Sequence, residues 1–333
     1  MHFIHIMGKN QLSNLVQMNS PGAVLDEVHL ILDLISPGFD KTQVTSAFSM
    51  IVSLFEGNYP GYQACNTEYH DLRHTTDTFL AMARLIHGAV IDGKTFSHGN
   101  INLGLISTLF HDTGYIQKKY DSEGTGAKYT VSHVRRSIDF LEIAGSEQIL
   151  PDNEIAAGQL MILCTDLTVD VPGMVFPSYQ IELLSKMLGA ADLLAQMADR
   201  TYLEKLLFLY REFKEAGVGG YENEVDLLQK TVGFYDFIDN RLKTMLDSTD
   251  RFMDSHFSSR WDIDKNLYHE SINRQKDYLQ QILGIPDTDH RNHLKRDGLV
   301  EKVRNKYGKN YCKPWAILFD NQIFILYIAV ITR

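Results

Sequence analysis

The stretch Leu105-Ile106-Ser107-Thr108-Leu109-Phe110-His111-Asp112-Thr113-Gly114 decides how we interpret this chain. A mostly apolar run, typical of a core helix, ends directly on a histidine and an aspartate. Burying an ionisable group is costly unless the group is paired, hydrogen-bonded or bound to a metal. Packing gives no reason for an imidazole and a carboxylate at this place, so we interpret His111 and Asp112 as a candidate chemical site.

The 333-residue chain has the composition of a globular protein, with 44% hydrophobic residues and a formal net charge of −10. A nucleic-acid polymer as partner is disfavoured, because neutralising its phosphates needs clustered Lys and Arg that we do not find. A small phosphorylated substrate such as a nucleotide stays compatible, because bound cations can supply local positive charge. The cysteines Cys65, Cys164 and Cys312 form no CxxC pair, which is typical of reduced thiols in a cytoplasmic protein.

The two ends of the chain give no sign of membrane insertion. The N-terminus lacks the basic region and the long apolar stretch of a signal peptide. Residues 323–331 form one apolar run, which is too short for a bilayer that needs about 20 helical residues. Its β-branched residues favour a strand or packed tail, and an interfacial or oligomer contact, as in a homodimer, is the alternative. We therefore expect a cytoplasmic protein without a membrane span.

Helical periodicity runs through most of the chain, and the breaks are marked by Pro and Gly. Ser20-Pro21 predicts a helix start and Ser36-Pro37-Gly38 its end. Further helices are predicted over residues 40–56, 69–91, 101–112, 130–144, 152–165, 177–216, 222–257 and 264–284. The sequence predicts a single all-α domain over residues 1–285, a compact multi-helix bundle around one core. Residues 286–333 are predicted to be a C-terminal extension, first a mixed-charge solvated helix or linker and then the short apolar tail.

Three further histidines and two further aspartates extend the candidate site. His70 and His74 are four residues apart, a spacing that puts both rings on one face of a helix. Asp192 interrupts an apolar helical run, where a cation would keep a carboxylate ionised. Asp166 ends another apolar run, but a helix cap explains it about as well. His133 follows the loop after residue 115 and could approach a second metal, with a core or loop histidine as the alternative.

A set of two histidines and two aspartates, collected from separate helices, suits a divalent metal. His74, His111, Asp112 and Asp192 offer the borderline and hard ligands that Zn²⁺, Mn²⁺, Fe²⁺ or Mg²⁺ accept. Such a site keeps open positions for water, and open water positions indicate hydrolysis.

The order of these residues resembles the H…HD…D pattern of the HD-domain metal-dependent phosphohydrolases. More narrowly, it is similar to the catalytic domain of class I cyclic-nucleotide phosphodiesterases, and the likeness runs in order from about residue 40 to 255. The matching segments are Tyr69–His74 for the YHNxxH motif, Leu163–Leu167 for an ATDM-like segment, Gly189–Leu193 for an ADLS segment and Thr231–Ile238 for QVGFIDYI.

The resemblance implies an HD/PDEase-like fold with two divalent ions in a central pocket and a bridging hydroxide that attacks phosphorus. It implies that His74, His111, Asp112 and Asp192 bind the first metal and that Asp112 also bridges to the second. By position His70 would be the general acid. Phe234 would stack on a base, with a plain core phenylalanine as the alternative.

Two positions depart from the family pattern. Thr231 stands in place of the glutamine that reads the purine, and one hydroxyl replaces an amide with two donors and an acceptor. The HDxxHPG motif continues here as His111-Asp112-Thr113-Gly114-Tyr115-Ile116, so Tyr115 replaces the second histidine. Tyr115, Asp166, Thr231 and Phe234 are the candidate substrate contacts.

The sequence thus predicts an enzyme, a metal-dependent phosphohydrolase acting on a phosphodiester that resembles a cyclic nucleotide. One alternative is an HD-type nucleotidase that acts on monophosphates. A di-iron oxygenase is disfavoured, because a six-ligand site would need an extra histidine between His133 and Asp192, and there is none from Val134 to Asp254. The other alternative is a non-catalytic module that senses a metal or nucleotide.

Overall fold

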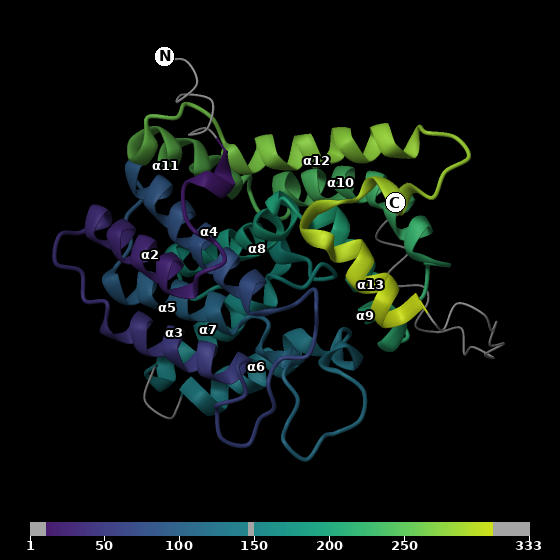
Figure 1. The fold of residues 1–333 in the computed structure, drawn as a ribbon. Helices are drawn as coiled ribbons and strands as arrows, with labels where there is room; N and C mark the ends of the chain where they lie inside the picture. The colour runs from purple at the N-terminus through teal and green to yellow at the C-terminus, as the bar shows by residue number, and fades with distance from the viewer. Residues whose placement is uncertain (1–10, 146–149, 309–333) are drawn as a thin grey trace.

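The computed structural model describes residues 11–145 and 150–308, and every regular element in these ranges is a helix (Figure 1). The only β-type contact there is an isolated bridge between Tyr62 and Lys118. The all-α class is therefore confirmed for the described part of the chain. The N-terminal residues and the apolar run at 323–331 lie outside it, so their expected roles stay predictions.

The α-helices of the described ranges account for most of these residues. Their bounds are α2 (Pro21–Ile35), α3 (Thr42–Phe55), α4 (Leu72–Ile91), α5 (His98–Phe110), α6 (His133–Ala144), α7 (Asp152–Leu163), α8 (Tyr179–Ala198), α9 (Tyr202–Glu215), α10 (Glu224–Thr244), α11 (Phe252–Trp261), α12 (Leu267–Leu283) and α13 (Leu299–Tyr307). Short 3-10 turns lie between them: η1 (Leu12–Asn14), η2 (Thr113–Tyr115), η3 (Gly126–Tyr129), η5 (Val171–Gly173), η6 (Thr249–Arg251), η7 (His290–His293) and η8 (Arg296–Gly298).

Two long helices of the prediction are wrong, since each is two helices in the structure. The predicted helix 177–216 breaks at Asp199, whose backbone leaves the helical region and whose carboxylate accepts hydrogen bonds from the Thr201 amide and hydroxyl, both at 2.9 Å. The predicted helix 222–257 breaks at Asp247 and Ser248, which both have φ of +51°. Neither break contains Gly or Pro. The apolar periodicity continues across both breaks, so the sequence predicted one helix in each case.

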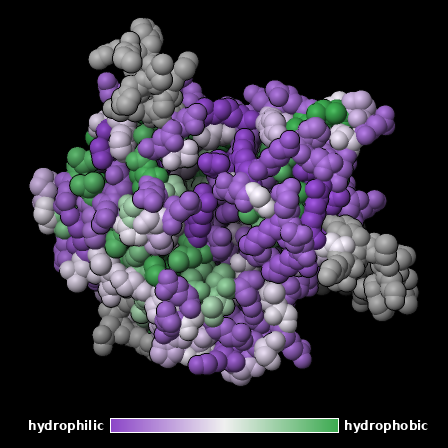
Figure 2. Space-filling view, viewed as in Figure 1, coloured by the Kyte–Doolittle hydropathy of each residue, from purple (hydrophilic) through white to green (hydrophobic). Residues whose placement is uncertain are grey.

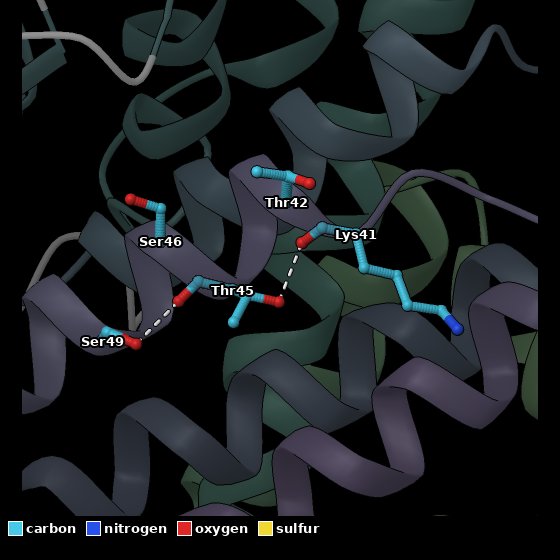
Figure 3. A pocket seen from close by; sticks show the side chains of 5 residues that line it. All are labelled: Lys41, Thr42, Thr45, Ser46 and Ser49. Atoms are coloured by element: carbon cyan, nitrogen blue, oxygen red, sulfur yellow. Dashed lines mark hydrogen bonds between the residues drawn. The ribbon is translucent and has the colours of Figure 1, made fainter.

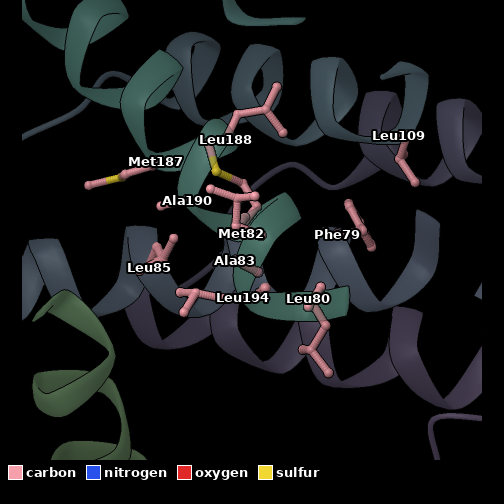
Figure 4. Close-up of a cluster of buried hydrophobic side chains, with 14 of the residues drawn as sticks. Phe79, Leu80, Met82, Ala83, Leu85, Leu109, Met187, Leu188, Ala190 and Leu194 are labelled. Atoms are coloured by element: carbon pink, nitrogen blue, oxygen red, sulfur yellow. The ribbon is translucent and has the colours of Figure 1, made fainter. Parts of the chain in front are cut away.

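Helix α4 is the centre of the bundle, because every residue from His74 to Ala89 is buried. In Figure 1, α4 and α8 lie between α2, α3 and α5 on the left and α9, α12 and α13 on the right. Figure 4 shows Phe79, Leu80, Met82, Ala83 and Leu85 of α4 meeting Met187, Leu188, Ala190 and Leu194 of α8 and Leu109 of α5. Burying one such large apolar side chain stabilises the fold by about 1.5–3 kcal/mol. The helices that carry the candidate ligands are thus held together by this apolar core.

The segment after residue 285 packs back onto the body of the protein. Val300 and Val303 of α13 are buried, and α13 lies against α9. Lys302 and Lys306 make ion pairs with Glu68 at 3.3 and 2.9 Å. The expected solvated helix is therefore half-buried, because valines three residues apart give this charged helix one apolar face. Where the domain ends stays a prediction.

The visible face of the molecule in Figure 2 is mostly hydrophilic, with separate hydrophobic patches. Exposed apolar side chains that are scattered in this way are normal for a folded protein. None of the described helices is both long and apolar enough to cross a bilayer.

Helix α4 crosses α11 at a point where only glycine fits. A Cβ at Gly88 would lie 1.7 Å from the backbone oxygen of Phe252 and 3.2 Å from the amide nitrogen of His256. Backbone atoms cannot move away as a flexible side chain can, so the two helices would have to separate.

We expect Gly88→Ala to lower the free energy of unfolding by about 1–3 kcal/mol or more, as overpacking does. Gly22→Ala is the matched control, because a Cβ at this helical glycine would meet only the Ser20 hydroxyl at 3.9 Å. Urea unfolding of both variants measures the difference. Equal stabilities for the two variants would contradict the close crossing.

A buried histidine pair joins the same two helices. Nδ1 of His87 lies 3.1 Å from Nδ1 of His256, so one ring must supply an N–H and the other a lone pair. Burial, together with the guanidinium of Arg84, holds the pKa of His256 well below its usual value, and burial also lowers the pKa of His87. Both imidazoles are therefore neutral in the folded protein near pH 7.

We predict that this pair costs stability in acid. Unfolded histidine titrates near pH 6.5, so below that pH the unfolded chain binds protons that folded His256 does not, and stability falls by at most about 1.4 kcal/mol per pH unit. His256→Gln removes this titration. We measure the free energy of unfolding of the natural protein and of His256→Gln by urea unfolding. Between pH 7.5 and pH 5, the value for the natural protein should fall relative to that of His256→Gln. A stability difference for His256→Gln that does not vary with pH would refute the prediction.

Candidate metal centre

Four of the predicted ligands meet in one place, where His74, His111 and Asp112 are buried and the Asp192 side chain is 13% exposed. His74 comes from α4, His111 and Asp112 follow α5, and Asp192 comes from α8. His74 Nε2 lies 3.0 Å from Asp192 Oδ1 and 3.4 Å from Asp112 Oδ2, while His111 Nε2 lies 3.4 Å from Asp112 Oδ2. The two Nε2 atoms are 3.4 Å apart. The ligand atoms of His74, His111 and Asp112 all lie within 4.8 Å of one another, so this group can hold a metal ion.

The charges of this cluster fit a cation. Burial would raise the pKa of Asp112 and Asp192, but the surrounding imidazoles outweigh burial and lower both. In return Asp112 and Asp192 raise the pKa of His111 to about 9, against the effect of burial. Asp112 Oδ2 is buried and makes no hydrogen bond with the described residues. A divalent cation would give this oxygen a partner and replace the proton that His111 carries.

Backbone carbonyls set which ring nitrogen faces the cluster. His111 Nδ1 lies 2.7 Å from the carbonyl oxygen of Thr108, which can only accept a hydrogen bond. Nδ1 therefore keeps a proton in either state of the ring, and when the ring is neutral, as a metal ligand must be, the lone pair is on Nε2. Fixing the ring of a ligand in this way is common around protein metals. Sequence reasoning did not identify Thr108.

His133 lies at the edge of the cluster. It begins α6, its Nδ1 lies 2.6 Å from the Thr130 carbonyl oxygen, and its Nε2 lies 3.8 Å from Asp112 Oδ1. Its side chain is 23% exposed, against 4% or less for His74, His111 and Asp112. The structure thus brings His133 to the second oxygen of Asp112, outside the tight group.

His70 is near the cluster, but the expectation that placed it on a helix face with His74 is wrong. The Asp71 carboxylate accepts a hydrogen bond from the His74 amide at 2.9 Å and caps α4, which therefore begins after His70. The two rings still lie 6.0 Å apart between centroids. The proximity comes from the loop before the helix and not from helical spacing.

Glu212 of α9 holds the His70 ring. Its Oε2 lies 2.6 Å from His70 Nδ1, and its Oε1 accepts hydrogen bonds from the amides of Glu68 and Tyr69 at 2.9 and 2.8 Å. Burial lowers the pKa of His70, but the Glu212 carboxylate outweighs it and the net shift is upward. Sequence reasoning missed Glu212, because nothing distinguishes it from the other acids of an amphipathic helix.

The four candidate substrate contacts have different surroundings. Tyr115 is buried and stacks on both His70 and His133. The buried Thr231 hydroxyl donates to the Leu227 carbonyl of its own helix at 2.8 Å. Half-buried Phe234 stacks on Phe237, and Asp166 Oδ1 accepts from the amide and hydroxyl of Thr168 at 2.8 and 2.7 Å. Only Tyr115 contacts residues of the candidate centre, and the roles of the other three stay predictions.

A hollow on the surface of α3 contributes no candidate site. Figure 3 shows the residues that line this hollow, which are Lys41, Thr42, Thr45, Ser46 and Ser49. The Thr45 hydroxyl donates to the Lys41 carbonyl at 2.8 Å and the Ser49 hydroxyl to the Thr45 carbonyl at 2.9 Å. These hydroxyl donors are used within the helix, and none of the lining residues belongs to the cluster.

In comparisons with known proteins, no protein-family model, no curated protein and no solved structure matches this chain. The likeness to the HD-domain phosphohydrolases therefore depends on the sequence motifs alone.

We predict that metal-free protein gains stability from a divalent ion through this cluster. At a free ion concentration 100 times Kd, the gain is about 2.7 kcal/mol. Thermal melts and calorimetric titration with Zn²⁺ and Mn²⁺ measure it. Asp112→Asn should lose the tight binding, whereas Asp166→Asn, the matched control outside the cluster, should keep it. Equal ion binding by the two variants would show that the cluster is not the site.

Proposed function

We propose that this chain is a metal-dependent phosphohydrolase of the HD-domain type, which hydrolyses a phosphodiester bond of a small substrate such as a nucleotide. The observation that carries the proposal is the meeting of His74, His111, Asp112 and Asp192 in one cluster beside His70. The order of these residues along the chain, similar to that of the class I cyclic-nucleotide phosphodiesterases, supports the same proposal.

The cluster is suited to divalent ions, and we propose two. His74, His111, Asp112 and Asp192 would hold the first, and the approach of His133 Nε2 to Asp112 Oδ1 supports a second on that side. When bound, such ions lower the pKa of water and neutralise charge that develops on a phosphoryl group. Two imidazoles with two carboxylates accept Zn²⁺, Mn²⁺, Fe²⁺ or Mg²⁺.

His70 is suited to donate a proton to the leaving oxygen. Its Nδ1 is engaged by Glu212, so Nε2 is the nitrogen left to face a substrate. Glu212 also favours the protonated imidazolium, which is the form that can donate. General acid catalysis of this kind typically contributes about 10²- to 10⁴-fold to the rate.

The structure bears on base recognition through Thr231. Its hydroxyl proton is used within α10, so it does not act as a free donor to a purine as an amide would. We therefore propose the phosphoester chemistry and leave the base to a substrate screen.

The test compares leaving groups. After metal is added, we expect cleavage of bis-p-nitrophenyl phosphate or of a 3′,5′-cyclic nucleotide. His70→Gln should lower turnover of the cyclic nucleotide by about 10²- to 10⁴-fold, since an alkoxide needs a proton to leave. The same variant should lose much less with p-nitrophenolate, a far weaker base.

The control is His98→Gln, an exposed histidine at the start of α5, which should leave both rates unchanged. Bound metal, measured by elemental analysis, should be the same in both variants. Equal losses on the two substrates would remove His70 as the acid. Cleavage of monophosphates alone would favour a nucleotidase, and tight nucleotide binding without turnover would favour a sensor module.

A further inference from the structure

Three aromatic rings form a cluster at the edge of the candidate centre. The Tyr115 ring stacks on two histidines, 4.3 Å from the His70 ring and 4.6 Å from the His133 ring between centroids. The interplanar angles are 11° and 24°, so both contacts are stacked. The tyrosine is 2% exposed. The two histidine rings are 6.1 Å apart between centroids, so Tyr115 packs beside both the proposed proton donor and the histidine near Asp112 Oδ1.

The backbone around Tyr115 is fixed on both sides. Its amide donates to the Asp112 carbonyl at 3.1 Å, and the preceding Gly114 amide donates to the Ser137 hydroxyl at 2.9 Å. A Cβ at Gly114 would lie 2.0 Å from the backbone oxygen of His133. A Cβ at Gly126 would lie 2.0 Å from the backbone oxygen of Tyr115. The ring thus projects from a segment with little room to move.

The contact between Tyr115 and His70 is made by the ring faces. The tyrosine hydroxyl lies 3.5 Å from His70 Nε2, which is long for a hydrogen bond. Because the two rings are nearly parallel, this hydroxyl lies over the imidazole and not in its plane, where the Nε2 lone pair or proton points. Stacking of aromatic rings is a favourable contact beyond the burial of their surface.

We propose that Tyr115 is a positioning residue that holds the His70 ring by stacking, so that Nε2 stays directed for proton transfer. The proposal rests on the phosphohydrolase function proposed above. Glu212 fixes His70 at one atom, Nδ1, and one hydrogen bond leaves the imidazole free to tilt about it. The flat face of Tyr115 removes that freedom. Misplacing a catalytic group by about 1 Å can cost about 10²-fold in rate.

The test uses two substitutions of Tyr115 and one matched control. Tyr115→Phe keeps the ring and loses the hydroxyl, whereas Tyr115→Leu loses the ring. Phe257→Leu removes an equally buried ring that also packs against a histidine, His256, at 5.2 Å, but outside the centre. On a cyclic nucleotide we expect Tyr115→Leu to lower kcat by about 10- to 100-fold with KM within about threefold. Tyr115→Phe and Phe257→Leu should stay within about threefold of the natural protein in kcat.

A second readout needs neither metal nor activity. In metal-free protein, the ring proton between the two nitrogens of His70 should resonate upfield because Tyr115 stacks on it. This proton NMR shift, assigned through His70→Gln, should persist in Tyr115→Phe and disappear in Tyr115→Leu. Phe257→Leu should leave it in place.

Three results would overturn the proposal: an unchanged His70 resonance in Tyr115→Leu, a kcat loss in Tyr115→Phe as large as in Tyr115→Leu, or unchanged kcat in Tyr115→Leu. The second result would assign the effect to the hydroxyl. If the natural protein cleaves no phosphoester, the proposed function fails, and the NMR shift still decides whether Tyr115 holds His70.

Discussion

The rest of the site depends on one constraint, the position of buried Asp112 and half-buried Asp192 beside two imidazoles. Two carboxylates cannot stay ionised away from water unless positive charge lies within a few ångströms. In the metal-free chain protonated His111, whose pKa the two carboxylates raise to about 9, supplies it. A divalent ion satisfies the same carboxylates without that proton and gives a partner to the buried Oδ2 of Asp112. The arrangement is more suited to a cation than to an ion pair alone.

The helices that provide these side chains are placed by apolar packing and by close backbone contacts. Helix α4 is buried along nearly its whole length, and α5 and α8 pack on it. Gly88 lets α11 approach α4, and Gly114 lets the segment after Asp112 approach α6. Carbonyl oxygens of Thr108 and Thr130 then orient two imidazoles. Residues outside the cluster therefore fix the positions of the candidate ligand side chains. These side chains then need little rearrangement during a reaction.

Much of this was visible in the sequence because it follows from burial. An apolar run that ends in His111-Asp112, and another interrupted by Asp192, indicated both the helices and the ligands. The missed features depend on contacts between distant segments: Glu212 meets His70 across 142 positions of sequence. The helix breaks at Asp199 and Asp247 were not predicted, because neither contains Gly or Pro. The Asp199 carboxylate caps the next turn, and Asp247 ends its helix in a left-handed backbone conformation. The start of α4 after His70 is likewise a capping effect.

The most direct test of the central claim is a crystal structure of the protein grown with Zn²⁺ or Mn²⁺, with data collected above and below the absorption edge of the metal. The account predicts an anomalous peak within about 2.0–2.3 Å of His74 Nε2, His111 Nε2 and carboxylate oxygens of Asp112 and Asp192. A second, weaker peak near the His133 side of Asp112 is expected at higher metal concentration. A cluster that stays without a peak at saturating metal, or ions only at other surfaces, would contradict it.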